Sequence, residues 1–149
     1  RGPMRAGTLL MIRSTYIVVA GPMDFDTNNE YLDLLKTPNT TIDTSTFEEL
    51  VPKLMGADLV VSVDTAIMHL AAGLGVPTVC IASAAYVNEI VPYSPIIMPK
   101  NIRFIFKSMD CQGCLGSCHL PTENQRFPCV SRIKLDHILT AINNLISEK

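Results

Sequence analysis

The sequence lacks the features that would point to a membrane-spanning or nucleic-acid-binding protein. No apolar run reaches the ~18 residues that a membrane-spanning helix needs, so no span is predicted. No long basic stretch occurs and the net charge is -2, which argues against a surface that binds nucleic-acid phosphates. No secretory leader pattern opens the chain, and we therefore expect a cytoplasmic protein.

The chain also has little charge and no low-complexity tract. Charged residues make up 17% and hydrophobic residues 48% of its 149 residues, which argues against long disorder and suits one domain with a core. Because Arg1-Gly2-Pro3 precedes the first methionine, we expect residues 1–3 to be a vector-derived remnant. Residues 4–149 are predicted to form a single domain, including a cysteine-rich loop at 111–129 and a C-terminal helix at about 134–147.

Short apolar runs alternate with segments of helical periodicity. The runs at 15–20, 59–63 and 76–81 are continuous, which is typical of strands buried on both faces of a parallel sheet. We expect 59–63 to be a central strand, 40–43 a further short strand and 102–106 an edge strand. The alternation predicts βαβ units and an α/β fold, namely a Rossmann-like three-layer domain with a mostly parallel sheet.

Four helices are predicted between and after these strands. Ser45 and Glu48 fit the S-x-x-E capping box of a helix that ends at Gly56. Pro52 is tolerable in this helix only within its first turns, where the lost N–H matters less. The other predicted helices cover residues 28–36, 66–74 and about 134–147.

The junction between the 59–63 strand and the next helix holds a polar cluster. Backbone N–H groups at a helix start are unpaired and carry positive partial charge, so a diphosphate placed over Thr65, Ala66 and Ile67 would satisfy them. His69 lies one turn further on the same face, and Asp64 suits a ribose hydroxyl better than a phosphate. The alternative is that Asp64 or Thr65 caps the helix and His69 is an interior histidine with satisfied hydrogen bonds.

Several segments around this junction resemble a known family. They are Ser45-Thr46-Phe47-Glu48-Glu49-Leu50, Ser62-Val63-Asp64-Thr65, His69-Leu70, Gly73-Leu74-Gly75-Val76-Pro77, Cys111-Gln112-Gly113-Cys114, Cys118 and Cys129. With the closing amphipathic helix, these segments resemble glycosyltransferase family 9, the family of the lipopolysaccharide heptosyltransferases. The resemblance covers roughly residues 16–147.

The resemblance implies the GT-B architecture, in which two Rossmann-like halves enclose the active site. This chain is similar to the C-terminal half, which binds a nucleotide-diphosphate-sugar donor such as an ADP-heptose-like molecule. By position, Thr65, Ala66 and Ile67 would hold the diphosphate and His69 would support it. The resemblance also implies that Ser45, together with Thr44, lies near the base of the nucleotide. It further implies that Asp26 or Asp24 holds the ribose.

The acceptor-binding half of the family, with its catalytic base, lies N-terminal to the segments that carry the resemblance. No catalytic residue is therefore assigned, and Arg5 and Arg13 are poor candidates for the family's phosphate-binding basic residue. We expect a fragment of an enzyme that transfers heptose or hexose to lipopolysaccharide or another glycan, inactive alone and requiring no cofactor or metal. Its expected partners are the donor sugar and an acceptor-binding half or a second copy, with peripheral membrane contact through the acceptor.

Two alternative functions stay open at this point. The chain can be a non-enzymatic nucleotide- or partner-binding domain, or a small structural metal domain built on the cysteines. Their spacing is C-x2-C-x3-C-x10-C, and Cys111, Cys114, Cys118 and Cys129 are chemically suitable for tetrahedral zinc, with His119 as a spare ligand. The second C-x2-C knuckle of the usual zinc pattern is absent, so free thiols and disulfides remain alternatives.

The remaining candidates carry less information. Gly113 and Gly116 predict that Cys111 and Cys114 lie in a loop, unlike a redox pair that opens a helix. Cys80 lies in an apolar strand and is predicted to be a core residue. Glu89 is a candidate for contact with a sugar hydroxyl, because its loop, 84–100, follows a strand that ends at the expected cleft. His137 is expected on the surface.

Overall fold

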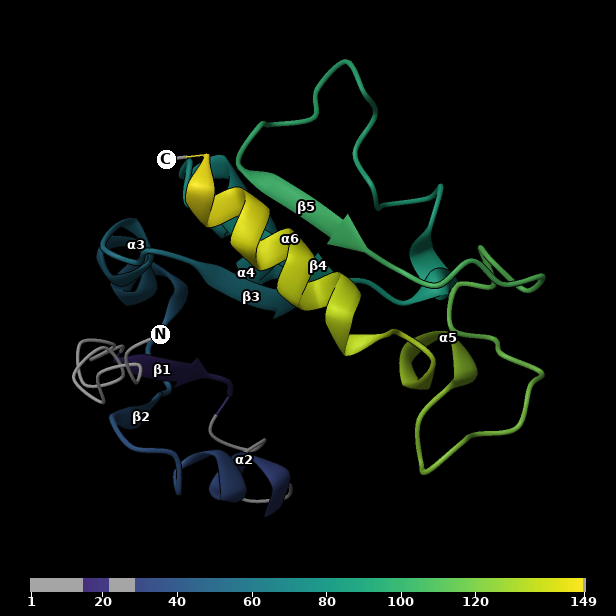
Figure 1. The fold of residues 1–149 in the computed structure, drawn as a ribbon, viewed down its shortest axis with the longest axis horizontal. Helices are drawn as coiled ribbons and strands as arrows, with labels where there is room; N and C mark the ends of the chain where they lie inside the picture. Colours follow the sequence, from purple (N-terminus) through teal and green to yellow (C-terminus); the bar gives the residue numbers. More distant parts are fainter. Residues whose placement is uncertain (1–14, 22–28, 149) are drawn as a thin grey trace, which may run out of the picture. The chain divides into compact units, whose positions relative to one another are not determined.

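The computed structural model describes residues 15–21 and 29–148. The chain divides into two compact units, an N-terminal unit that ends at Leu50 and a C-terminal unit that begins at Val51 (Figure 1). The prediction of a single domain over 4–149 stays a prediction, and residues 1–3 lie outside the described ranges. Within those ranges, no helix is long and apolar enough to cross a membrane.

The N-terminal unit contains two parallel strands, β1 (Tyr16–Val19) and β2 (Thr40–Asp43). Helix α2 (Asn29–Leu34) lies between them in the sequence, so the predicted strand–helix–strand order is confirmed. Tyr16 and Ile17 are each 50% exposed, and the predicted burial of this strand on both faces is therefore wrong for β1. β-branched and aromatic residues also suit a strand that is only half-buried, so an apolar run alone does not establish burial on both faces.

Helix α3 (Phe47–Met55) begins with a capping box one residue later than predicted. The Thr46 N–H donates to Glu49 Oε2 at 2.9 Å, and the Glu49 N–H donates to Thr46 Oγ1 at 3.5 Å. The Ser45 N–H donates instead to Asp43 Oδ1 at 2.8 Å, which makes a turn before the helix. Pro52 lies in the second turn of the helix, which ends before Gly56 as predicted.

The C-terminal unit contains a parallel three-stranded sheet in the order β3-β4-β5. Its strands are β3 (Val60–Val63), β4 (Thr78–Ile81) and β5 (Ile102–Ile105). β4 is the central strand of this sheet, and its residues Thr78, Val79 and Cys80 are fully buried. β3 is at an edge with Val61 48% and Val63 53% exposed, so the prediction that it is central is wrong for this sheet. β5 forms the other edge, as predicted.

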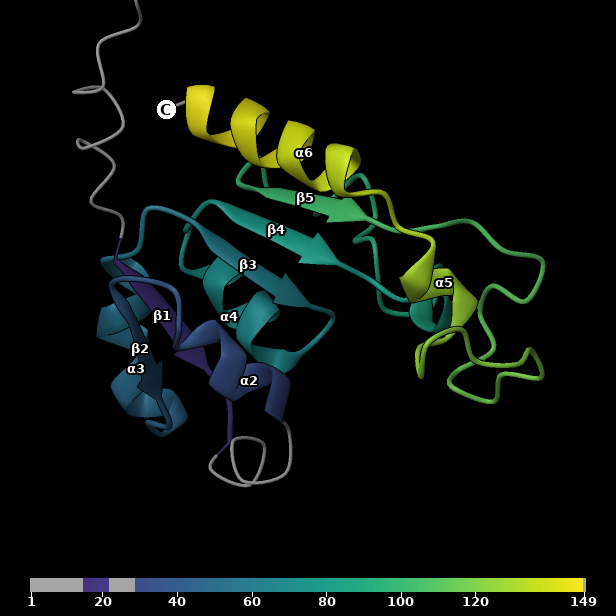
Figure 2. The same ribbon diagram turned by 60° about the horizontal axis from the view of Figure 1, so that its bottom comes forward.

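Two helices cover opposite faces of this sheet. α4 (Ala66–Gly73) connects β3 to β4, and α6 (Leu135–Ser147) packs on the other face (Figure 2). Side chains alternate along β4, so Cys80 packs with Met68 of α4 while Val79 packs with Leu145 of α6. The result is a helix–sheet–helix sandwich of three layers, and it confirms the predicted α/β, Rossmann-like fold.

Irregular segments complete the C-terminal unit. Between β4 and β5, a single 3-10 turn, η2 (Ala84–Tyr86), opens a long loop, as predicted for residues 84–100. The short helix α5 (Pro128–Ser131) includes Cys129, so it occupies the end of the segment predicted as a cysteine-rich loop at 111–129. Gly75, at a φ of 78°, adopts the left-handed conformation in the turn between α4 and β4, which favours glycine there.

Candidate functional site

The predicted anion-binding turn lies where β3 ends and α4 begins. Thr65 is the N-cap of α4 in an extended conformation, and its carbonyl accepts hydrogen bonds from Met68 N–H at 3.0 Å and His69 N–H at 3.4 Å. The Thr65 N–H itself donates to the Val63 carbonyl at 2.8 Å. These bonds fix the turn so that the first helical residues, Ala66 and Ile67, come directly after the carboxyl end of the strand.

No side chain caps α4. The Thr65 hydroxyl lies 3.3 Å from Ser62 Oγ, and Asp64 Oδ2 accepts a hydrogen bond from Ser83 Oγ at 3.1 Å. The capping alternative is therefore not realised. Within the described part of the chain, the N–H groups of Ala66 and Ile67 have no protein acceptor, and Ala66 is exposed. The helix start is thus free to receive an anionic group.

His69 and Tyr93 form a hydrogen-bonded pair beside this turn. His69 Nδ1 lies 2.6 Å from Tyr93 Oη, and the two ring centroids are 5.6 Å apart. Both side chains are half-buried. His69 is therefore held on one side by a protein partner, as the interior-histidine alternative expected, while its place in the first turns of α4 keeps it close to the helix start. The sequence does not reveal Tyr93, because it lies 24 residues from His69 in an irregular loop.

Asp64 also influences the core beneath the turn. The pKa of Cys80 is raised to about 12, first by burial and then by the negative charge of Asp64. Cys80 is fully buried, which confirms it as a core residue. Its thiol remains protonated at neutral pH, so it is not available as a nucleophile.

The other predicted contacts for the nucleotide sugar belong to other segments of the chain. Ser45 belongs to the N-terminal unit, where it lies half-buried in the turn before α3. Asp24 and Asp26 lie outside the described residues. Glu89 is exposed in the loop after η2, and its N–H donates to the Tyr86 carbonyl at 3.1 Å. These assignments stay predictions.

The four cysteines of the C-terminal loop line one cavity of about 180 Å³. Gly113 N–H donates to the Ala84 carbonyl at 2.9 Å, and Leu115 N–H donates to the Ala85 carbonyl at 3.0 Å. These bonds hold the loop against η2. Cys111 and Cys114 lie in turns, as predicted, with Gly113 at a φ of 80°.

The thiols around this cavity are free, with no disulfide among the described cysteines. Burial, followed by the proximity of Cys118 and Cys114, raises the pKa of Cys111. No group of three or more potential ligands among the described residues is arranged to hold a metal ion, and His119 is exposed. The thiols, as described, are therefore not gathered into a set of ligands for zinc, and a role for zinc in this loop stays a prediction.

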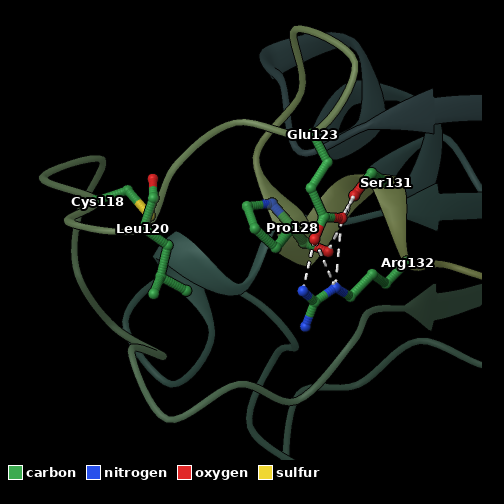
Figure 3. Close-up of polar contacts among 6 residues, drawn as sticks. All are labelled: Cys118, Leu120, Glu123, Pro128, Ser131 and Arg132. Carbon is green, nitrogen blue, oxygen red and sulfur yellow. Dashed lines mark hydrogen bonds and ion pairs between the residues drawn. The ribbon is translucent and has the colours of Figure 1, made fainter.

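An ion pair joins the end of the cysteine-rich loop to α5 (Figure 3). Glu123 accepts hydrogen bonds from Ser131 Oγ at 2.6 Å and from Arg132 Nη2 at 2.5 Å. These hydrogen bonds, that of Arg132 first, lower the pKa of Glu123. On the same loop, the Cys118 thiol lies 4.0 Å from the Leu120 carbonyl. These contacts connect Glu123 of the loop to the end of α5 and Cys118 to a neighbouring carbonyl of the loop.

Comparison with known proteins places these features in a family. No curated protein and no solved structure matches the chain significantly. Glycosyltransferase family 9 (heptosyltransferase) matches residues 18–113, which is more than half of the chain. The matched range contains the Asp64–His69 turn and Tyr93 but ends before Cys114, and it supports a function of the glycosyltransferase type. With this match over a parallel α/β fold, the chain belongs to glycosyltransferase family 9.

Proposed function

We propose that this chain is the donor-binding domain of a glycosyltransferase and holds a nucleotide-diphosphate sugar at the start of α4. The observation that carries the proposal is the pair of unpaired N–H groups of Ala66 and Ile67 at an uncapped helix start. The helix dipole makes this position electropositive without any basic side chain. A diphosphate is the part of a sugar donor that such a position stabilises best.

The neighbouring side chains suit the rest of such a donor. The Thr65 hydroxyl, exposed beside Ser62, is a donor for a phosphate oxygen. The Asp64 carboxylate is held by Ser83 and would repel phosphate, so it is better suited to accept a hydrogen bond from a ribose or sugar hydroxyl. Ser45 and Asp26 remain the proposed contacts to the base and the ribose.

The proposed reaction transfers heptose or hexose from the donor to lipopolysaccharide or another glycan. An acceptor hydroxyl oxygen would bond to the anomeric carbon as the bond from that carbon to the diphosphate oxygen breaks, and negative charge would develop on the leaving diphosphate. The N–H groups of Ala66 and Ile67 would stabilise that charge, in place of a divalent cation. We assign no catalytic base to this chain, and we propose that it depends on an acceptor-binding half or a second copy for turnover. The proposed location is the cytoplasm, with membrane contact only through the acceptor.

The test is titration with ADP, UDP and GDP, comparing Ala66→Pro with Ala66→Val. Proline is well tolerated at the first position of a helix, and the extended Thr65 suits a residue before proline. Ala66→Pro therefore removes one N–H without breaking the helix, while Ala66→Val adds similar bulk and keeps the N–H. We expect saturable binding that Ala66→Pro weakens by about tenfold and that Ala66→Val weakens less.

Two results would contradict the proposal. If none of the three nucleotides binds to the wild-type chain, no donor site exists in this chain by itself. If Ala66→Pro binds as tightly as the wild-type chain, the helix start does not hold the diphosphate. Unfolding curves of both variants would show that neither change disrupts the fold.

A non-enzymatic nucleotide-binding domain is the second candidate. It requires only the anion-binding start of α4, which is the observation that favours it, and no catalytic base. Sugar transfer would separate the two candidates: the family activity requires product once an acceptor-binding half is supplied, whereas a binding domain would give nucleotide affinity and no product.

A further inference from the structure

The hydrogen bond between His69 and Tyr93 restricts the chemistry of the histidine ring. His69 is the fourth residue of α4, and Tyr93 comes from the loop between β4 and β5. Their contact, at 2.6 Å between Nδ1 and Oη, occupies one of the two ring nitrogens. The other nitrogen, Nε2, is on the opposite side of the ring.

Tyr93 is itself held in place by the core of the C-terminal unit. Its ring meets Phe104 of β5 edge-on, with centroids 5.2 Å apart and planes at 81°. It also packs against the buried cluster that includes Met68 and Cys80. The hydroxyl is therefore presented to His69 by a ring that packing fixes from two sides.

The hydroxyl has one hydrogen and two neighbours that can accept it. Met68 Sδ lies at 3.7 Å and His69 Nδ1 at 2.6 Å. In the alternative arrangement, the hydroxyl donates to Met68 Sδ and the Nδ1–H of His69 donates to Tyr93 Oη. Thioether sulfur is a weak acceptor, whereas a neutral imidazole nitrogen is a strong one, so donation from the hydroxyl to His69 Nδ1 is favoured. The pKa of Tyr93 is raised, first by burial and then by Cys80, and the hydroxyl thus remains protonated at neutral pH.

We propose that Tyr93 is a positioning residue that fixes neutral His69 in the tautomer with its proton on Nε2. A ring nitrogen that accepts from Tyr93 has no proton of its own, so the proton must lie on the other nitrogen. In this tautomer, His69 offers an N–H donor on the side of the ring away from Tyr93. The opposite tautomer would offer a lone pair there, which phosphate oxygens repel.

The inference deepens the proposed function and rests on it for its ligand, a nucleoside diphosphate. The hydrogen bond to Tyr93 would make His69 a donor to the diphosphate before the nucleotide arrives. Such pre-organisation reduces the cost of ordering the site on binding. Tyr93 does not need to touch the nucleotide for this effect.

The test uses Tyr93→Phe, which keeps the ring that packs on Phe104 and removes only the hydroxyl. Tyr86→Phe is the matched control, because Tyr86 packs against the same core cluster. The chain contains three histidines, so the ¹⁵N signals of His69 can be assigned by their loss in His69→Gln. We expect Nε2–H with a hydrogen-bonded Nδ1 in the wild-type chain and in Tyr86→Phe, and a mixture of tautomers in Tyr93→Phe.

Binding of ADP, UDP or GDP provides the second measurement. We expect Tyr93→Phe to weaken nucleotide binding about three- to tenfold, and to cause no further loss when combined with His69→Ala. A purely structural role for Tyr93 would lower the melting temperature without moving the His69 signals. That result would overturn the inference, as would an Nδ1–H tautomer in the wild-type chain.

The two proposals fail in different ways. If the wild-type chain binds no nucleotide, the donor site fails, while the NMR spectra still decide whether Tyr93 sets the His69 tautomer. If nucleotide binds but Tyr93→Phe changes neither the tautomer nor the affinity, the inference fails and the donor site stands.

Discussion

Two regions of the C-terminal unit gather polar or reactive side chains: the turn between β3 and α4, and the cysteine-rich loop. They differ in what their backbone N–H groups bond to. In the turn, side chains bond to one another, as Asp64 does with Ser83, and two N–H groups at the helix start find no acceptor among the residues that the structure describes. In the loop, Gly113 and Leu115 donate to the carbonyls of η2, while the thiols face a cavity. The turn thus leaves N–H donors available, whereas the loop uses its N–H donors to bond to another segment of the same unit.

The largest expected effect comes from the core under the turn. Met68 is fully buried and packs with Ala72 and Cys80, so Met68→Ala should lower the free energy of unfolding by about 2–5 kcal/mol. Chemical denaturation would measure the change. Met55→Ala, at a position that is 64% exposed, is the control and should change stability little. If both substitutions cost the same, the helix that presents the proposed site does not depend on this core.

A smaller effect is expected from the cysteine cavity. Cys129 is 7% exposed, and Cys129→Ser would place a hydroxyl in apolar surroundings at a cost of about 1–3 kcal/mol. We expect nucleotide affinity to stay unchanged, because the loop is not part of the proposed donor site. Cys118→Ser, at a less buried position, should cost less. A large loss of nucleotide binding in Cys129→Ser would contradict the separation of the two regions.

The ion pair between Glu123 and Arg132 should make a small, pH-dependent contribution. The folded state lowers the pKa of Glu123 from 4.5, so its contribution to stability is present above that value. The contribution is lost as the pH falls through the lowered pKa. Glu123→Gln should therefore lower the melting temperature by no more than about 2 °C at pH 7, because the pair is exposed. The difference from the wild-type chain should shrink towards pH 3, and a difference that grows on acidification would contradict this account.

The smallest expected effect is that of a chelator. Because the described thiols are not arranged to hold a metal ion, protein purified without chelator should contain no stoichiometric zinc. Addition of EDTA should then leave the melting temperature unchanged. Elemental analysis giving one zinc per chain, with stability lost in EDTA, would show that the thiols rearrange around a metal. That result would make the loop a metal-binding site, and the loop would then differ less from the turn than the described structure indicates.

Much of the fold could be predicted because it depends on local patterns. The apolar runs at β1, β3 and β4 and the amphipathic α6 all lie close to their predicted positions. The sequence predicts the capping box of α3 one residue too early, because Ser45–Glu48 and Thr46–Glu49 both fit the same spacing. Only the Asp43–Ser45 turn decides between them. The position of β3 at the edge of its sheet depends on long-range pairing, which the residues of one strand do not encode.

The candidate site likewise has one part that local sequence predicts and another part that depends on long-range contacts. The Asp64–His69 turn was predictable because a helix start after a strand follows from the local sequence. Tyr93 was not, because its hydroxyl reaches His69 only through the path of an irregular loop and through packing on Phe104. The pairing of Asp64 with Ser83 likewise joins the carboxyl ends of two neighbouring strands, which are far apart in the sequence.

Three consecutive residues after β4 connect the turn before α4 with the cysteine-rich loop. Ser83 holds Asp64, and the carbonyls of Ala84 and Ala85 hold the cysteine-rich loop. An inserted residue between Ser83 and Ala84 would shift the contact to Asp64 relative to the contacts to the cysteine-rich loop, because consecutive residues make them. For anyone who places a tag, a linker or a circular-permutation break in this protein, the segment 83–85 is thus the wrong place to open the chain, even though it lies outside the strands and α-helices.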